Sequence, residues 1–258
     1  MHASGLGQSY QVMQGAGATA GSPFITAAGI VNAASYAAGV SPTEIVAIFG
    51  SNLGPAQLTY PTLQGGQFPS TLSGVQVLFD GKPAPLIYVS AGQVSAIVPA
   101  AVAQSQTATV QVIYNLASSA ILQVPVTATI PGLFSANSSG QGQGAILNQD
   151  TSYNSTTNPA TADSVVVLFA TGLGSTDVAV PDGALVTGPT LPKPALPVQV
   201  LIGGKTAAID YAGAAPYLVY GVFQINAHVP SGLAPGAQPV TLRVGTVNSQ
   251  TGLTVAVK

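Results

Sequence analysis

The most constraining feature of the sequence is an internal duplication. Residues 75–88 read Val-Gln-Val-Leu, a turn with Gly-Lys, and an apolar run ending at Tyr88, and residues 198–211 repeat this order up to Tyr211. All matched positions in the two stretches lie 123 residues apart. Self-similarity at a fixed spacing indicates that one structural unit occurs twice. The sequence therefore predicts two domains of the same fold before any local propensity is considered.

The match continues on both sides of this stretch. The run IVAIFGSNLG ending at Gly54 matches VVVLFATGLG ending at Gly174, and QVSAIVP ending at Pro99 matches QINAHVP ending at Pro230. The spacing grows to 131 residues at the last of these pairs. Since surface loops tolerate insertions better than strands do, this growth predicts an insertion in the second copy, most visibly at 213–221.

Short apolar runs bounded by turn residues predict strands rather than helices. In the two copies these runs lie at 45–49, 75–79, 84–89, 94–98, 107–114 and 121–128, and at 165–169, 198–202, 207–211, 222–229, 240–244 and 253–257. Asp80-Gly81 and Gly203-Gly204 each separate two runs, as expected of tight hairpins whose turn residues take positive φ. Short strands at this spacing are typical of an immunoglobulin-like sandwich.

We therefore expect an all-β protein made of two tandem immunoglobulin-like β-sandwiches with an extended N-terminal arm. The arm takes residues 1–26, the first sandwich 27–129 and the second 130–258. The Thr-Ile-Pro-Gly sequence at 129–132 is a short stiff linker that should hold the sandwiches in a limited set of angles.

Charge is scarce, and this narrows the range of partners. Only 5% of residues are charged, where soluble proteins average about 25%. The five basic residues are scattered, so no patch could neutralise phosphates and nucleic acid is not an expected partner. No apolar run approaches the roughly 18 residues of a spanning helix, so we expect no membrane span. Domains of this size bury adequate cores without disulfides, so the absence of cysteine leaves the compartment open.

Residues with catalytic or metal-binding potential are few. His228 aligns with Ile97 of the first copy, which favours a core or interface histidine over a catalytic one. Asp177 and Asp182 could contribute to a calcium site, but such a site needs six to eight oxygens and a plain turn is favoured. We expect no catalytic residues, no metal, no cofactor and no enzymatic activity.

Two further sets of residues are candidates for contacts at the surface. Tyr88 and Tyr211 occupy equivalent positions and could form a sugar-stacking platform if exposed, although aromatic residues in strands usually pack against a core face. Asn137 and Asn154 begin Asn-x-Ser/Thr sequons and are candidate glycosylation sites, although such sequons also arise by chance in Ser/Thr-rich chains.

The N-terminal arm belongs to neither repeat and has no Asp, Glu, Lys or Arg residue. Residues 8–14 alternate in polarity as a strand does, which places Tyr10 and Val12 on one side. With Met13, these residues form the expected assembly segment. The arm could be a disordered leader. It could instead add as a strand to an open sheet edge of a neighbouring subunit, and contacts of this heterologous kind generate fibres.

Several motifs resemble known families. The order FGSNLG, VLFDGKPA, QVSAIVP is similar to the immunoglobulin-like IPT/TIG domain pattern. GIVNAASY at 29–36, PGLF at 131–134, ATGLG at 170–174 and QINAHVP at 224–230 resemble more closely the uncharacterised "Solibacter C-terminal domain" family of acidobacterial secreted proteins, over residues 27–258. The resemblance implies an extracytoplasmic β-sandwich module with no assigned activity.

These observations together predict a secreted structural protein, extracellular or on the cell surface. We expect it to be a subunit that polymerises with itself into a filament or surface assembly through the arm and the sandwich edges. The alternative is a monomeric carbohydrate- or surface-binding adhesin module, with glycans as partners.

Overall fold

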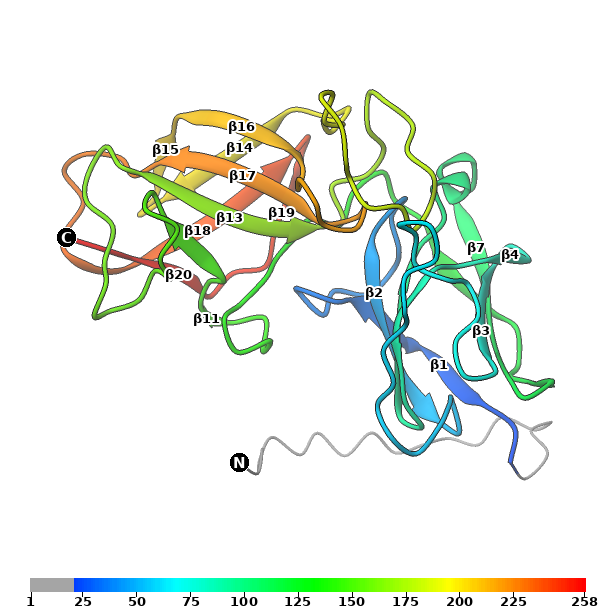
Figure 1. Ribbon diagram of the computed structural model, residues 1–258. Helices are drawn as coiled ribbons and strands as arrows, with labels where there is room; N and C mark the ends of the chain where they lie inside the picture. Colours follow the sequence, from blue (N-terminus) through cyan, green and yellow to red (C-terminus); the bar gives the residue numbers. More distant parts are fainter. Residues whose placement is uncertain (1–20) are drawn as a thin grey trace.

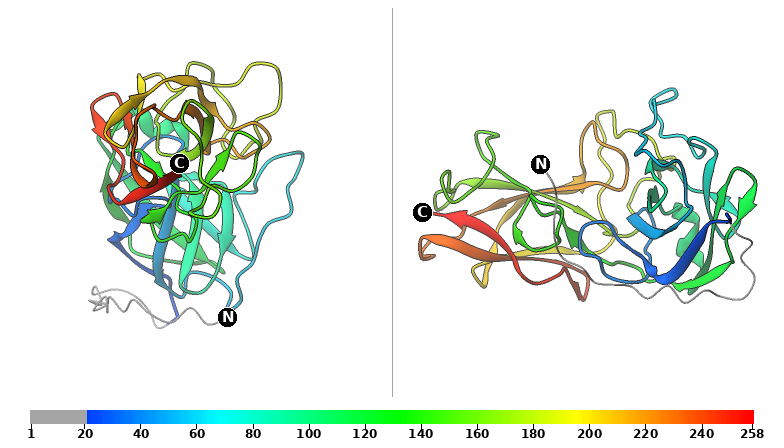
Figure 2. Two further views of the ribbon diagram at one scale, coloured as in Figure 1. Left: turned by 90° about the vertical axis from the view of Figure 1, so that its left-hand side faces the viewer. Right: turned by 90° about the horizontal axis from the view of Figure 1, so that it is seen from below.

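The computed structural model describes residues 21–258, and the regular secondary structure within them is almost entirely β-strand. The ribbon forms two lobes, with the C-terminus at the end of the second lobe that points away from the first (Figure 1, Figure 2). The described residues contain one short 3-10 helix, η1 (Ala100–Gln104). This confirms the predicted fold class of two tandem β-sandwiches.

The first lobe consists of two sheets around one core. One sheet has the order β1-β2-β6-β5, with bounds Phe24–Asn32, Ile45–Ser51, Gln93–Ile97 and Leu86–Val89. The other has the order β4-β3-β7-β8, with β9 also on β7, and bounds Lys82–Pro83, Val75–Phe79, Thr107–Tyr114, Ala117–Ser118 and Leu122–Pro125. Alternate residues such as Val75, Val77 and Phe79 are fully buried between the sheets.

The second lobe repeats this arrangement. One sheet has the order β10-β13-β17-β16, with β12 also on β13, and bounds Gly132–Leu133, Val165–Thr171, Phe223–His228, Ile209–Ala214 and Ile146–Asn148. The other has the order β11-β20-β18-β14-β15, with β19 on β18, and bounds Gly142–Gln143, Leu253–Val257, Gly236–Val244, Val198–Ile202, Lys205–Ala207 and Val247–Asn248. Strand neighbours match those of the first lobe, which confirms the duplication.

The two predicted hairpin turns are confirmed. Asp80 and Gly81 have φ of 50° and 73° and join β3 to β4, while Gly203 and Gly204 have φ of 58° and 77° and join β14 to β15. Positive φ at both central residues gives the twist that a two-residue hairpin needs.

Every predicted run contains strand residues, but β1, β12 and the two-residue strands β4, β8, β10, β11 and β19 were not predicted. β1 begins at Phe24, so residues 24–26, which we assigned to the arm, belong to the first sheet. Its exposed middle and a register shift between Ile25 and Ile30 obscure the period of two in the sequence. β12 has only three residues and the others have two each, too few to give a pattern.

Candidate functional site

The two sandwiches meet in an apolar contact, which we call the joint. On the first sandwich, Ile45 of β2 and Ile97 of β6 point away from their own core. They pack with Val219, Val222 and Leu185 of the second sandwich. Val219 lies in the segment where the sequence predicted an insertion, so the inserted loop of one copy covers the part of the other copy's outer sheet face that carries Ile45 and Ile97.

Hydrogen bonds reinforce the joint. The Ile45 amide donates to Thr171 Oγ1 at 2.9 Å, and this hydroxyl donates to the Gly221 carbonyl at 2.7 Å. The Thr43 hydroxyl donates to the Gly174 carbonyl at 3.3 Å. These groups are buried, and a hydrogen bond inside an interface orients the partners as well as satisfying them.

A short antiparallel bridge adds to the joint. Gln67 pairs with Ala184, with flanking amide-to-carbonyl bonds from Phe68 to Gly183 at 2.8 Å and from Leu185 to Gly66 at 3.0 Å. Next to this bridge, Asp182 Oδ1 accepts a hydrogen bond from the Ala100 amide of the first sandwich at 3.0 Å.

Asp182 and Asp177 have different partners. Asp177 Oδ1 accepts from the Lys193 amide at 2.8 Å within the second sandwich, whereas Asp182 bonds across the joint. Within residues 21–258, no three His, Cys, Asp or Glu side chains gather as metal ligands would. The two carboxylates therefore act here as acceptors that fix loops.

Glu44 is a buried carboxyl group near the joint, and its sequence context gave no sign of this. Its Oε2 accepts from the Ser41 amide at 2.6 Å and from the Ser41 hydroxyl at 3.0 Å, whereas Oε1 has no hydrogen-bond partner. Burial raises the pKa of Glu44 to about 8, against the opposing effects of Ser41 and Asn32. The group is therefore uncharged at neutral pH in the folded protein.

Four aromatic side chains gather on the outer face of the β1-β2-β6-β5 sheet, beside the joint. We call Tyr36, Phe49, Tyr60 and Tyr88 the aromatic platform. Tyr36 and Phe49 stack with ring centroids 6.4 Å apart, and Tyr60 meets Tyr88 edge-on at 6.1 Å. Of these four residues the sequence singled out Tyr88 alone, because Tyr36 lies in a turn and Tyr60 in a loop, and Phe49 was considered only as part of a predicted strand.

Tyr211, the repeat equivalent of Tyr88, is not part of such a cluster. Its hydroxyl donates to the Ala214 carbonyl at 2.7 Å, and its ring lies against Gly213. The sequence therefore predicted correctly that the two tyrosines are equivalent in the ladder, but only one of them has exposed aromatic neighbours.

The other residues of the repeat motifs lie at structural positions. Gly54 fits between Val75 and the Ser90 carbonyl, Pro99 precedes η1, and Pro230 follows β17. Gly174 has φ of 83° and faces the Ala128 carbonyl, which directly precedes the linker. The contacts of these residues are explained by their role in shaping the backbone.

His228 lies neither in the core nor at the joint, so the expectation of a core histidine is wrong. Its side chain is 37% exposed, with Nε2 2.9 Å from Asp210 Oδ2 and Nδ1 3.0 Å from the Asp163 carbonyl oxygen. The equivalent Ile97 is buried because the second sandwich covers it. The alignment identified the position correctly but could not show that only one copy is covered.

The environment of His228 gives a pH prediction. Its hydrogen bonds to the Asp163 carbonyl and to Asp210 raise its pKa above 6.5. Because the folded state favours the protonated form, the pair stabilises the protein fully below pH 6.5 and loses this effect as the pH rises through the folded pKa. We expect Asp210→Asn to lower the His228 pKa in an NMR titration. An unchanged midpoint would show that the pair contributes nothing.

The two sequons differ in accessibility. Asn137 is exposed, and its side-chain oxygen accepts from Ser139. Asn154 is buried, and its Nδ2 donates to Asn148 Oδ1 and to the Ala256 carbonyl, both at 2.9 Å. A glycan on this nitrogen would require both bonds to break, so Asn154 is unsuited to glycosylation in the folded protein. Asn137 remains the candidate.

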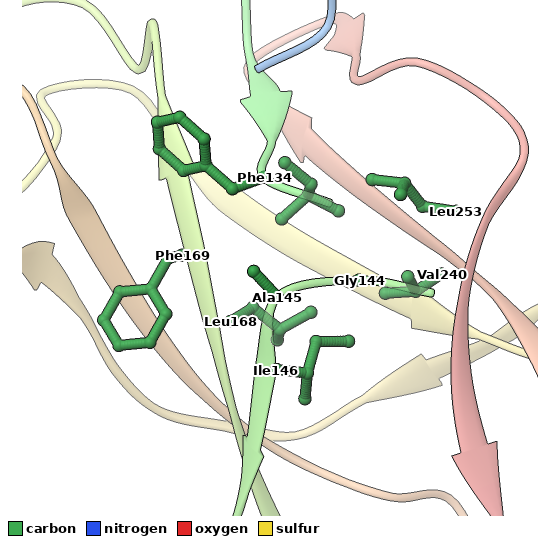
Figure 3. Close-up of a pocket in the computed structure, with 9 residues that line it drawn as sticks. Phe134, Gly144, Ala145, Ile146, Leu168, Phe169, Val240 and Leu253 are labelled. Atoms are coloured by element: carbon green, nitrogen blue, oxygen red, sulfur yellow. The ribbon is translucent and has the colours of Figure 1, made fainter. Parts of the chain in front are cut away.

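A small void in the second sandwich is no candidate site. All its lining residues are apolar or glycine, including Ile146, Leu168 and Leu253, as Figure 3 shows. It is too small to hold a water molecule, so it is a packing gap in the core.

The three assembly residues Tyr10, Val12 and Met13 lie outside the described residues. Within residues 21–258, no helix is long and apolar enough to span a membrane.

The fold and the joint define a tandem immunoglobulin-like β-sandwich protein. Residues 39–130 match the family model of the IPT/TIG domain, which agrees with the resemblance of the first copy's motifs. No curated protein matches the chain.

Solved structures give weaker likenesses. The plexin A4 extracellular region shares 12% identity at a TM-score of 0.28, covering 92% of this chain and 18% of that one. The Bacteroides ovatus mixed-linkage glucan utilization locus protein SGBP-B, in complex with a mixed-linkage heptasaccharide, shares 15% identity at a TM-score of 0.32. The match covers 85% of this chain and 42% of that one. Surface layer protein SbsC, domains 4-9, shares 14% identity at a TM-score of 0.21, and the match covers 92% of this chain and 30% of that one. This chain spans less than half of each, and at these values the likenesses say nothing of function.

Proposed function

We propose that the chain is a structural module of an extracellular or cell-surface assembly, in which the two sandwiches act as one unit. The joint carries this proposal. Domains joined by small polar contacts move relative to each other by default. Here an apolar cluster around Ile45, a strand-like bridge at Gln67 and buried hydrogen bonds at Thr171 oppose such motion.

Self-assembly is the second part of the proposal. An interface poor in ions avoids the desolvation cost of several kcal/mol that each unpaired ion brings. The chain has few ions to bury, and the arm residues Tyr10, Val12 and Met13 are the proposed strand that adds to a neighbouring sandwich edge. Membership of the "Solibacter C-terminal domain" family, a glycan on Asn137 and the absence of enzymatic activity are further proposals.

Deleting residues 1–22 tests the assembly, because β1 begins only at Phe24 and stays intact. At tens of micromolar, we expect the full chain to sediment as polymers and to form filaments by negative stain, and the deleted chain to sediment as monomers. Equal thermal stability of both is the control for folding. A monomeric full chain would refute the polymerisation proposal, and polymers without the arm would refute its role.

A further inference from the structure

We infer that the aromatic platform is a binding site for an uncharged polysaccharide. The platform lies on the outer face of the first sandwich, where Phe49 belongs to the outward-facing row of β2 and Tyr88 lies on β5. Three platform rings are substantially exposed: Tyr60 by 66%, Tyr36 by 41% and Phe49 by 39%. Exposed aromatic groups gathered at one place mark a contact surface more often than scattered ones do.

The two ring pairs form one continuous surface. Phe49 lies opposite Gln93 in the ladder between β2 and β6, and Gln93 Nε2 donates to the Tyr88 hydroxyl at 2.7 Å. Tyr88 also lies within electrostatic reach of both Tyr36 and Tyr60. Gln93 therefore links the stacked pair to the edge-on pair.

The rings are held in place before any ligand binds. Gln93 fixes the Tyr88 hydroxyl, and the Tyr36 hydroxyl donates to the Ser138 carbonyl of the second sandwich at 2.6 Å. The loop that carries Tyr60 is tied to β5 by reciprocal backbone bonds between Thr59 and Val89, at 2.9 and 3.0 Å. A preformed surface loses less conformational entropy on binding, so even a shallow site can hold a ligand.

The charges select the chemistry of the ligand. Segments 24–60 and 84–98, which build the platform, contain one ionisable acid or base of the Asp, Glu, Lys and Arg types, and this is the buried Glu44. The facing loop at 135–140 contains none. A phosphate or carboxylate ligand would lose its hydration with no cation to replace it. The surface therefore fits an uncharged ligand.

The mixture of rings, hydroxyls and an amide favours sugar over a purely apolar partner. Tyrosine presents an apolar ring and a phenol that both donates and accepts, and the glutamine amide does the same. A pyranose ring has apolar C–H faces to lie on rings and hydroxyls at its rim to meet such groups. A ligand site with aromatic lining and a few fixed polar groups has this composition.

This inference gives residues to the carbohydrate-binding alternative and does not depend on self-assembly. The test measures retention of the arm-deleted chain on insoluble cellulose, chitin and an insoluble α-glucan. We expect retention on at least one of them, and at least a tenfold weaker affinity for Tyr60→Ala and for Phe49→Ala. Tyr153→Ala, which removes a tyrosine that is 81% exposed on the second sandwich, is the matched control and should bind as the parent does.

Salt and self-association separate the remaining explanations. Binding should hold between low and 1 M salt, because the platform has no exposed ion to screen. Retention on none of the three polysaccharides overturns the inference, and so does equal loss in the Tyr153→Ala control. A dimer of the arm-deleted chain that Tyr60→Ala dissociates would show that a second copy covers the platform, and would also overturn it.

Discussion

Glu44→Gln is expected to abolish most of the decline in stability that we expect of the protein between pH 4.5 and 8. The folded state raises the pKa of Glu44 from 4.5 to about 8, so over this range the unfolded chain is ionised while the folded protein keeps its proton. The folded state then binds more protons, and the free energy of unfolding falls as the pH rises. At 1.36 kcal/mol per pH unit, the loss reaches about 3 kcal/mol by pH 7.

Glutamine keeps an oxygen for the Ser41 bonds and cannot ionise, so it removes this slope. Urea unfolding at half-unit steps from pH 4.5 to 8 measures the slope directly, apart from any constant cost of the buried amide. Asp150→Asn is the control, because Asp150 is exposed and its hydrogen bonds to Ser152 lower its pKa. Parallel pH curves for the parent and Glu44→Gln would contradict the prediction.

Gly221→Ala should destabilise the protein by disrupting the joint. A Cβ at Gly221 would lie 2.5 Å from the Thr43 carbonyl oxygen of the other sandwich, and the glycine has φ of 120°. The strained backbone costs about 1–3 kcal/mol. The clash adds about 1–3 kcal/mol, because backbone on the opposite side must move.

Gly236→Ala separates these two costs. Gly236 has φ of 119° in the same sandwich, and a Cβ there meets nothing within 4 Å. Calorimetry should give one transition for the parent and for Gly236→Ala, and a larger loss with two separate transitions for Gly221→Ala. Equal losses in the two variants would show that the sandwiches do not stabilise each other through this contact.

The sequence predicted most of the fold because most of the duplicated residues lie in strands and in the turns between them. Runs such as those around Val75 and Val198 alternate or stay apolar over the length of a strand, and their turns carry glycine where positive φ is needed. β1 was not predicted because its bulge and its exposed middle break the alternation of buried and exposed residues.

The joint and the platform could not be predicted in the same way. Each gathers residues from segments far apart in sequence, such as Ile45 with Val219, or Tyr36 with the carbonyl of Ser138. Repetition identifies equivalent positions, but it does not reveal which copy covers the other. The growth in spacing near 213–221 was the one signal of the joint, because that inserted loop is what reaches Ile45 and Ile97.

The unequal treatment of Ile97 and His228 has an evolutionary consequence. The second copy carries the loop with Val219, and the first copy carries the apolar residues Ile45 and Ile97 that this loop covers, so the two copies contribute different halves of the joint. The second copy bears an imidazole paired with Asp210 where the first bears isoleucine. The two sandwiches are therefore not interchangeable. A third sandwich that packed on the second as the second packs on the first would meet the polar surface around His228 instead of an apolar one.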